Sequence, residues 1–157
     1  MKYFLLLTFI SLSSILGYSQ ENSFIIGSWK TIAHSDINMY MNLETDSIAL
    51  YGGIAIMNAD TTSQKNILQY AKNIYSKLQY HFEKNGIFKQ ISDTITVLTG
   101  TYKIDTTNRK LEFTVNLLLT GSRLTEALDY EFTDNIFKFF SIQNNKRISM
   151  TALRKIE

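Results

Sequence analysis

Apolar and polar residues alternate along most of the chain from position 78 onward. A period of two places alternate side chains on opposite faces of a β-strand. Turn-forming residues separate these runs about every ten positions, as in antiparallel sandwiches and barrels. The eight predicted strands are 29–33, 78–83, 87–91, 94–104, 111–117, 124–132, 136–142 and 147–156.

The segment before the second strand follows a different period. Within residues 61–77, apolar residues recur with the 3.6-residue spacing of a helix, and Thr61 to Gln64 has the Thr-x-x-Gln spacing of a capping box. The pattern therefore predicts a helix inserted between the first and second strands. The preceding stretch Ile48–Met57 is apolar with Gly52-Gly53 in its middle, and fits a hairpin, a second helix or a mobile flap.

The predicted faces indicate what occupies the interior. An antiparallel barrel of eight strands is just wide enough to be filled by side chains or to hold one small ligand. Tyrosines on the inward face offer hydroxyl groups within an apolar space, as small-molecule pockets require. The residues predicted to contact such a ligand are Tyr80, Phe82, Phe88, Tyr102, Phe113, Tyr130, Phe137, Phe139 and Met150.

Two charged residues occupy strand positions that the alternation predicts to face the interior, which we call inward parity. Glu126 lies near the start of its strand, either in water at the rim, or as a polar contact for a ligand, or as a partner for a cation. Arg154 lies in the last strand, which pairs with the first in an up-and-down barrel. We therefore expect Arg154 to stack on Trp29 and close one end, because a guanidinium over an indole is stabilising.

These residues also carry a family resemblance. Gly27-Ser28-Trp29 in the first strand, with Arg154 in the last, resembles the Gly-x-Trp motif and closing arginine of the lipocalin family. YHFEKNGIFKQ (80–90) and GTYKID (100–105) are similar to lipocalin-like domains of secreted bacterial proteins. The resemblance implies a calycin-type barrel that binds a small hydrophobic molecule, with Gly27, Trp29 and Arg154 as structural closure residues. The long helical segment before the second strand departs from many lipocalins.

The N-terminus predicts an export signal. Lys2 precedes the apolar run Phe4–Leu16, and Gly17-Tyr18-Ser19 has the small residues of a cleavage site. The run is shorter than the about 20 residues that span a bilayer as a helix. We expect residues 1–19 to be a signal peptide and 20–157 to be one lipocalin-like domain, secreted or periplasmic and not inserted in the membrane. A buried N-terminal helix is the alternative.

Composition and motifs reduce the number of functional classes that fit the chain. The formal net charge of +2 argues against a nucleic-acid partner, and a chain with 0 Cys can form neither disulfides nor a thiolate zinc site. The 2 histidines, His34 and His81, have no second ligand at metal spacing, and no nucleophile motif occurs. We expect no cofactor, no metal and no catalysis. The alternatives are a filled barrel that serves as an envelope interaction or scaffold module, and an enzyme built on Glu126 with Arg154.

Overall fold

The computed structural model describes residues 23–51, 60–116 and 122–157. The predicted signal peptide and Gly52-Gly53 lie outside these residues. The strands are β1 (Gly27–Ser35), β2 (Met39–Asn42), β3 (Ser47–Leu50), β4 (Leu78–Phe82), β5 (Ile87–Ser92), β6 (Ile95–Asp105), β7 (Lys110–Asn116), β8 (Arg123–Thr133), β9 (Ile136–Gln143) and β10 (Lys146–Lys155), and the helix is α3 (Thr61–Lys77).

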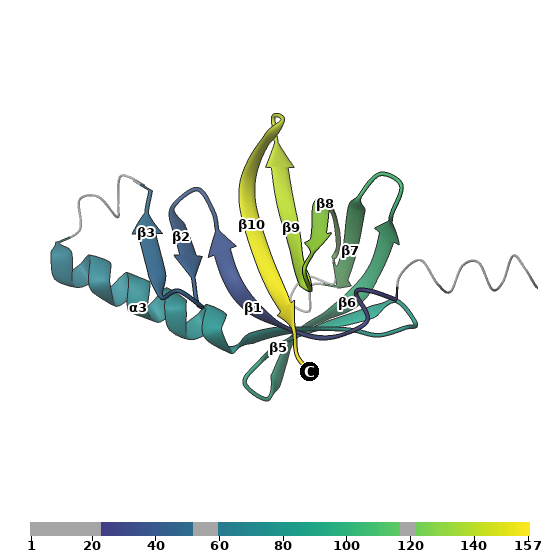
Figure 1. Ribbon diagram of the computed structural model, residues 1–157, viewed down its shortest axis with the longest axis horizontal. Helices are drawn as coiled ribbons and strands as arrows, with labels where there is room; N and C mark the ends of the chain where they lie inside the picture. The colour runs from purple at the N-terminus through teal and green to yellow at the C-terminus, as the bar shows by residue number, and fades with distance from the viewer. Residues whose placement is uncertain (1–22, 52–59, 117–121) are drawn as a thin grey trace, which may run out of the picture.

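Eight of these strands form a closed antiparallel barrel. β4 to β10 pair in chain order, and β1 closes the ring by pairing with β4 on one edge and β10 on the other. Figure 1 shows the strands curving around a common interior, with β1 beside β10. The predicted all-β fold, an eight-stranded up-and-down barrel with an inserted helix, is confirmed.

β1 changes partners halfway along one edge. Its first part, Gly27 to Lys30, pairs with β4, whereas Ala33 to Ser35 pairs with β2. At the point of change, the Thr31 hydroxyl donates to the Leu78 carbonyl at 3.0 Å. The β2–β3 hairpin thus extends the sheet beyond the ring. Of the stretch Ile48–Met57, whose structure the sequence left open, the residues up to Leu50 form part of this hairpin.

The helix begins and ends where the sequence period predicts. Its N-cap is Asp60, whose carboxylate accepts from the backbone amides of Thr62 and Ser63 at 2.9 Å. The predicted capping box that begins at Thr61 is therefore wrong by one residue, because Asp60 satisfies the first amides itself. Across the described residues, no helix combines the length and apolar composition that a membrane-spanning segment needs.

Among the described residues, side-chain contacts attach α3 to the barrel and to the β2–β3 hairpin. The Tyr75 ring stacks on His34 of β1, with centroids 4.2 Å apart. Lys77 pairs with Asp93 in the β5–β6 turn at 3.1 Å, and Lys72 pairs with Asp46 in the β2–β3 turn. In Figure 1, α3 accordingly runs beside the β2–β3 hairpin toward the barrel wall. A helix of this length needs such docking to be stable in water.

A bulge changes the register between β1 and β10. The paired positions shift between Thr31 and Ala33, so Lys155 faces Trp29 and Arg154 faces Lys30. A one-residue shift moves each later side chain to the other face of the sheet. The prediction that Arg154 stacks on Trp29 is therefore wrong. Arg154 lies on the outside and pairs with Glu44 at 2.7 Å.

The same register corrects the predicted inward face of β10. Met150 packs with Ile32, Ala33 and Ala152 in a cluster separate from the barrel core. Leu153, which is fully buried, belongs to the core. The prediction that Met150 faces the interior is therefore wrong.

Aromatic side chains fill one end of the barrel. Trp29 is fully buried, and its indole N–H donates to the Ile25 carbonyl at 2.6 Å. The Phe137 ring lies 6.0 Å from Trp29 and 6.3 Å from Phe82, centroid to centroid. Phe24, just before β1, packs against Phe132 in a tilted arrangement, with the ring centroids 5.0 Å apart. We call this end, where Trp29 and the residues preceding β1 pack, the closed end.

Candidate ligand-binding cavity

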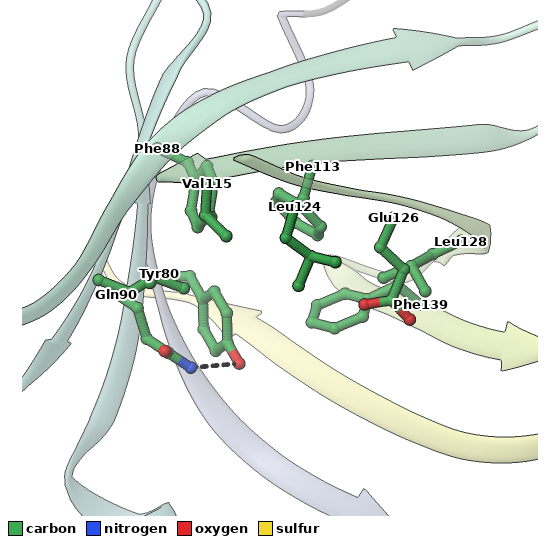
Figure 2. Close-up of a pocket in the computed structure, with 10 residues that line it drawn as sticks. Tyr80, Phe88, Gln90, Phe113, Val115, Leu124, Glu126, Leu128 and Phe139 are labelled. Atoms are coloured by element: carbon green, nitrogen blue, oxygen red, sulfur yellow. Dashed lines mark hydrogen bonds between the residues drawn. The ribbon is translucent and has the colours of Figure 1, made fainter. Parts of the chain in front are cut away.

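A cavity of about 200 Å³ lies inside the barrel. Its walls come from β4 to β9, and most of the side chains are apolar or aromatic, as Figure 2 shows. Phe113 of β7 and Phe139 of β9 lie on either side of β8, with their ring centroids 5.8 Å apart in an edge-to-face arrangement. The lining residues are Tyr80, Phe88, Gln90, Leu98, Phe113, Val115, Leu124, Glu126, Leu128 and Phe139.

Gly100 shapes the wall of this cavity. It pairs with Phe88 on β5 and with Val115 on β7, both of which line the space. A Cβ at position 100 would lie 2.3 Å from the Thr114 carbonyl oxygen, 2.7 Å from the Phe88 ring and 2.9 Å from Val115. Glycine thus lets these two lining side chains approach each other across β6.

Tyr80 and Gln90 supply the neutral polar groups of the cavity. The Gln90 side-chain amide donates to the Tyr80 hydroxyl oxygen at 2.8 Å, as drawn in Figure 2. Burial raises the pKa of Tyr80 to about 12. The hydroxyl therefore keeps its proton at neutral pH and can donate one hydrogen bond.

Glu126 is the charged residue of the lining. Its side chain is exposed to solvent at the cavity, and one carboxylate oxygen accepts from the Ser141 hydroxyl at 2.6 Å. The prediction of a rim position in water is consistent with this exposure. The enzyme alternative required Glu126 to meet Arg154, but Arg154 pairs with Glu44 on the outside of the barrel. The structure therefore gives no support to acid–base chemistry by this pair.

The predicted ligand contacts divide between the two ends. Tyr80, Phe88, Phe113 and Phe139 line the cavity, whereas Phe82, Tyr102, Tyr130 and Phe137 belong to the packed core away from it. The Tyr102 hydroxyl donates to the Glu83 carbonyl at 2.9 Å and so has a protein partner already. The interior is thus filled at the closed end and open at the other. It is intermediate between the two alternatives from the sequence, a barrel filled by side chains and a barrel that holds a ligand.

Several lining residues were absent from the predicted contacts. Leu98, Val115, Leu124 and Leu128 have inward parity, and the alternation that located the aromatic residues also locates them. Gln90 is polar, so hydrophobic alternation gives no sign that it faces inward. It shares the inward parity of Phe88, two residues earlier, and pairs with Tyr80 on β4.

The two histidines do not line the cavity and contact other residues of the protein. His34 is stacked on Tyr75, and its Nδ1 lies 3.2 Å from the Thr151 hydroxyl. Burial lowers the pKa of His34, although Asp36, 3.7 Å away, acts in the opposite direction. His81 is partly buried, with Nδ1 2.8 Å from the Ser28 hydroxyl. The described residues contain no group of three or more metal-ligating side chains.

Comparison with known proteins supports the fold. No protein-family model matches the chain, and no curated protein matches it. A solved structure of a DUF4847 family protein from Bacteroides vulgatus ATCC 8482 is similar, with a TM-score of 0.53 and 14% sequence identity. The match covers 85% of this chain and 94% of that one. At this identity the similarity concerns the barrel fold alone, and the resemblance to lipocalins stays a prediction.

Proposed function

We propose that this protein binds a small, largely apolar molecule inside the barrel. The observation that carries the proposal is the cavity of about 200 Å³, with apolar walls and a few polar groups. This combination is typical of small-molecule sites, in which apolar walls provide affinity and polar groups fix orientation.

The volume limits the size of the ligand. Pockets for drug-sized molecules have volumes of about 300–1,000 Å³, whereas an engineered apolar cavity of about 150 Å³ holds benzene. The cavity of this protein lies between these values. The ligand we propose is therefore a single aromatic ring, or an aliphatic group of similar size, with a short substituent.

The proposed site of action is the periplasm or the exterior of the cell. It rests on the signal-peptide pattern of residues 1–19, because export would leave the barrel of residues 23–157 to act there. Expression of the full chain, followed by fractionation and N-terminal sequencing, tests this part. A protein that keeps its N-terminus and stays in the cytoplasm would contradict it.

Binding can be tested with a neutral probe and one cavity-filling variant. Isothermal titration calorimetry of the protein with 2-phenylethanol should give a saturable, single-site isotherm. Leu98→Trp should abolish this binding, because Leu98 lines the cavity and a larger side chain would occupy it. Ile95→Trp is the matched control, since Ile95 lies on the same strand but is 68% exposed and outside the lining.

The outcomes of this experiment are distinct. Loss of binding in Leu98→Trp with retention in Ile95→Trp, both folded by circular dichroism, would place the probe in the cavity. Absence of binding to the wild type, or equal binding by the two variants, would overturn the proposal. Trp29 fluorescence is a poor reporter, because Trp29 is fully buried among the closed-end aromatics and does not line the cavity.

A further inference from the structure

We infer that the ligand carries a protonated amine, and that its ammonium group pairs with the carboxylate of Glu126. The inference rests on the proposed function and specifies the chemical class of the ligand. The juxtaposition that carries it is one solvent-accessible carboxylate in a cavity whose other lining residues are uncharged or apolar.

The charge that lines the cavity is negative only. The lining contains Glu126 and no lysine, arginine or histidine. Tyr80 does not change this balance, because its raised pKa of about 12 keeps the hydroxyl neutral. An apolar ligand with a positive group would therefore meet a complementary charge at this cavity, whereas a carboxylate ligand would meet a like charge.

Glu126 also retains capacity to accept hydrogen bonds. A carboxylate has about four acceptor positions, and among the described residues the hydroxyl of Ser141 is the donor that reaches it. Ser141 is neutral, so it orients the carboxylate without cancelling its charge. An ammonium group, with three donors and no acceptor, fits this requirement.

The basic residues that pair with the other acidic residues of β8 do not pair with Glu126. On the same strand as Glu126, Asp129 pairs with Lys110, and Glu131 pairs with Arg147 at 2.5 Å. Arg147 also lies over the Phe140 ring, 3.8 Å from its centroid. Glu126 thus differs from both other acidic residues of β8, which have basic partners on β7 (Lys110) and β10 (Arg147).

The remaining lining fits the rest of such a ligand. The Phe113 and Phe139 rings and the leucine side chains would surround an aromatic or aliphatic body. The Tyr80 hydroxyl, already accepting from Gln90, would remain able to donate to an acceptor on the ligand. The ligand class is therefore an arylalkylamine or alkylamine of about one-ring size.

Three isosteric probes test the sign of the charge. 2-Phenylethylammonium, 2-phenylethanol and phenylacetate share a ring and a short substituent but differ in charge. By calorimetry at neutral pH and low salt, the ammonium probe should bind about fivefold more tightly than the alcohol, which is the size of effect of a solvent-accessible ion pair. Phenylacetate should bind more weakly than the alcohol.

Variants assign the preference to Glu126. Glu126→Gln should bind 2-phenylethanol like the wild type but lose the preference for the ammonium probe. Glu131→Gln is the matched control, because Glu131 lies on the same strand and pairs with Arg147 away from the cavity lining. This control should keep the preference.

The outcomes separate the two proposals. Equal binding of the ammonium probe and the alcohol to the wild type would overturn the inference and leave the proposed function standing. A preference that persists in Glu126→Gln would overturn it as well, because the charge would then act from another position. If none of the three probes binds, the proposed function fails and the inference fails with it.

Discussion

The ammonium nitrogen of Lys155 lies 5.7 Å from the centroid of the Trp29 ring. Its aliphatic chain passes close to Gly27, where an added Cβ would lie 3.2 Å from Lys155 Cε. Gly27 also has a φ of 124°, a conformation that favours glycine. Gly27, Trp29 and Lys155 thus form one contact at the closed end, in which lysine occupies the position predicted for Arg154.

Replacement of Trp29 should reveal this contact. Trp29→Ala should lower the free energy of unfolding by about 3–5 kcal/mol, because the ring is fully buried. In urea-denaturation double-mutant cycles, Lys155→Ala should couple to Trp29→Ala, whereas Arg154→Ala should be additive within about 0.5 kcal/mol. Coupling to Arg154 and additivity with Lys155 would contradict the observed register.

Gly100→Ala should destabilise the barrel and change the cavity. The new methyl group would lie 2.3 Å from a backbone carbonyl oxygen, so β6 and β7 would have to move apart. We expect a loss of about 3 kcal/mol, at the upper end of the effect of overpacking. Thermal denaturation measures this loss, and Thr99→Ala, at an exposed neighbouring position, is the control. Equal stability of the two variants would contradict the tight approach at Gly100.

Stability should fall when His34 becomes protonated. Burial lowers the pKa of His34 from 6.5, so the folded protein binds this proton less readily than the unfolded chain. The free energy of unfolding should therefore be fully retained above pH 6.5 and decrease as the pH falls from 6.5 toward the lowered pKa. In His34→Gln this part of the pH dependence should disappear from urea-denaturation curves.

The His34 titration can also be observed directly. The ring-proton resonance of His34 should titrate with a midpoint below 6.5 in the folded protein, because desolvation outweighs the opposing effect of Asp36. A midpoint at or above 6.5 would show that the interaction with Asp36 dominates and would contradict the predicted decrease in stability.

Removal of the Asp60 cap should loosen the start of α3. Asp60→Ala leaves the Thr62 and Ser63 amides without the carboxylate that accepts from them. Their hydrogen exchange should become faster, whereas Thr61→Ala should leave exchange almost unchanged because the Thr61 side chain does not cap the helix. A larger effect from Thr61→Ala would instead support the capping box predicted from the sequence.

Much of the fold is readable from the sequence because the turns are strongly marked. Asp134-Asn135 and Asn144-Asn145 have positive φ angles, which asparagine and aspartate tolerate better than most residues. These turns fix the ends of β8, β9 and β10 to within about one or two residues of the prediction. The helix is equally readable, because its apolar period differs from that of the strands.

The parts that could not be predicted depend on single-residue shifts. The bulge after Thr31 has no distinctive residue, yet it shifts the pairing by one position, so that Lys155 faces Trp29 and Arg154 faces Lys30. Met150 was misplaced because β10 carries apolar residues on both faces: Met150 and Ala152 pack in a separate cluster, whereas Leu153, opposite Phe137, belongs to the barrel core. Parity along β8 was read correctly for Glu126, because no register irregularity separates it from Leu128 in the pairing with β7. The alternation predicts which side chains face inward, but it does not predict which of them line the cavity, because that depends on how the side chains pack.

The change of partners along β1 divides the sheet into two parts: the closed ring, and a branch point after Lys30 where β1 leaves β4 and pairs with β2. We call this branch point the fork. Where Gly27 to Lys30 lies between β4 and β10, no strand can leave without breaking bonds on both of its edges. From Ala33 onward, β1 pairs instead with β2, which belongs to a short hairpin outside the ring. Gradual opening of the protein should therefore begin at the fork, where α3 and the hairpin can detach while the ring around the aromatic end remains intact.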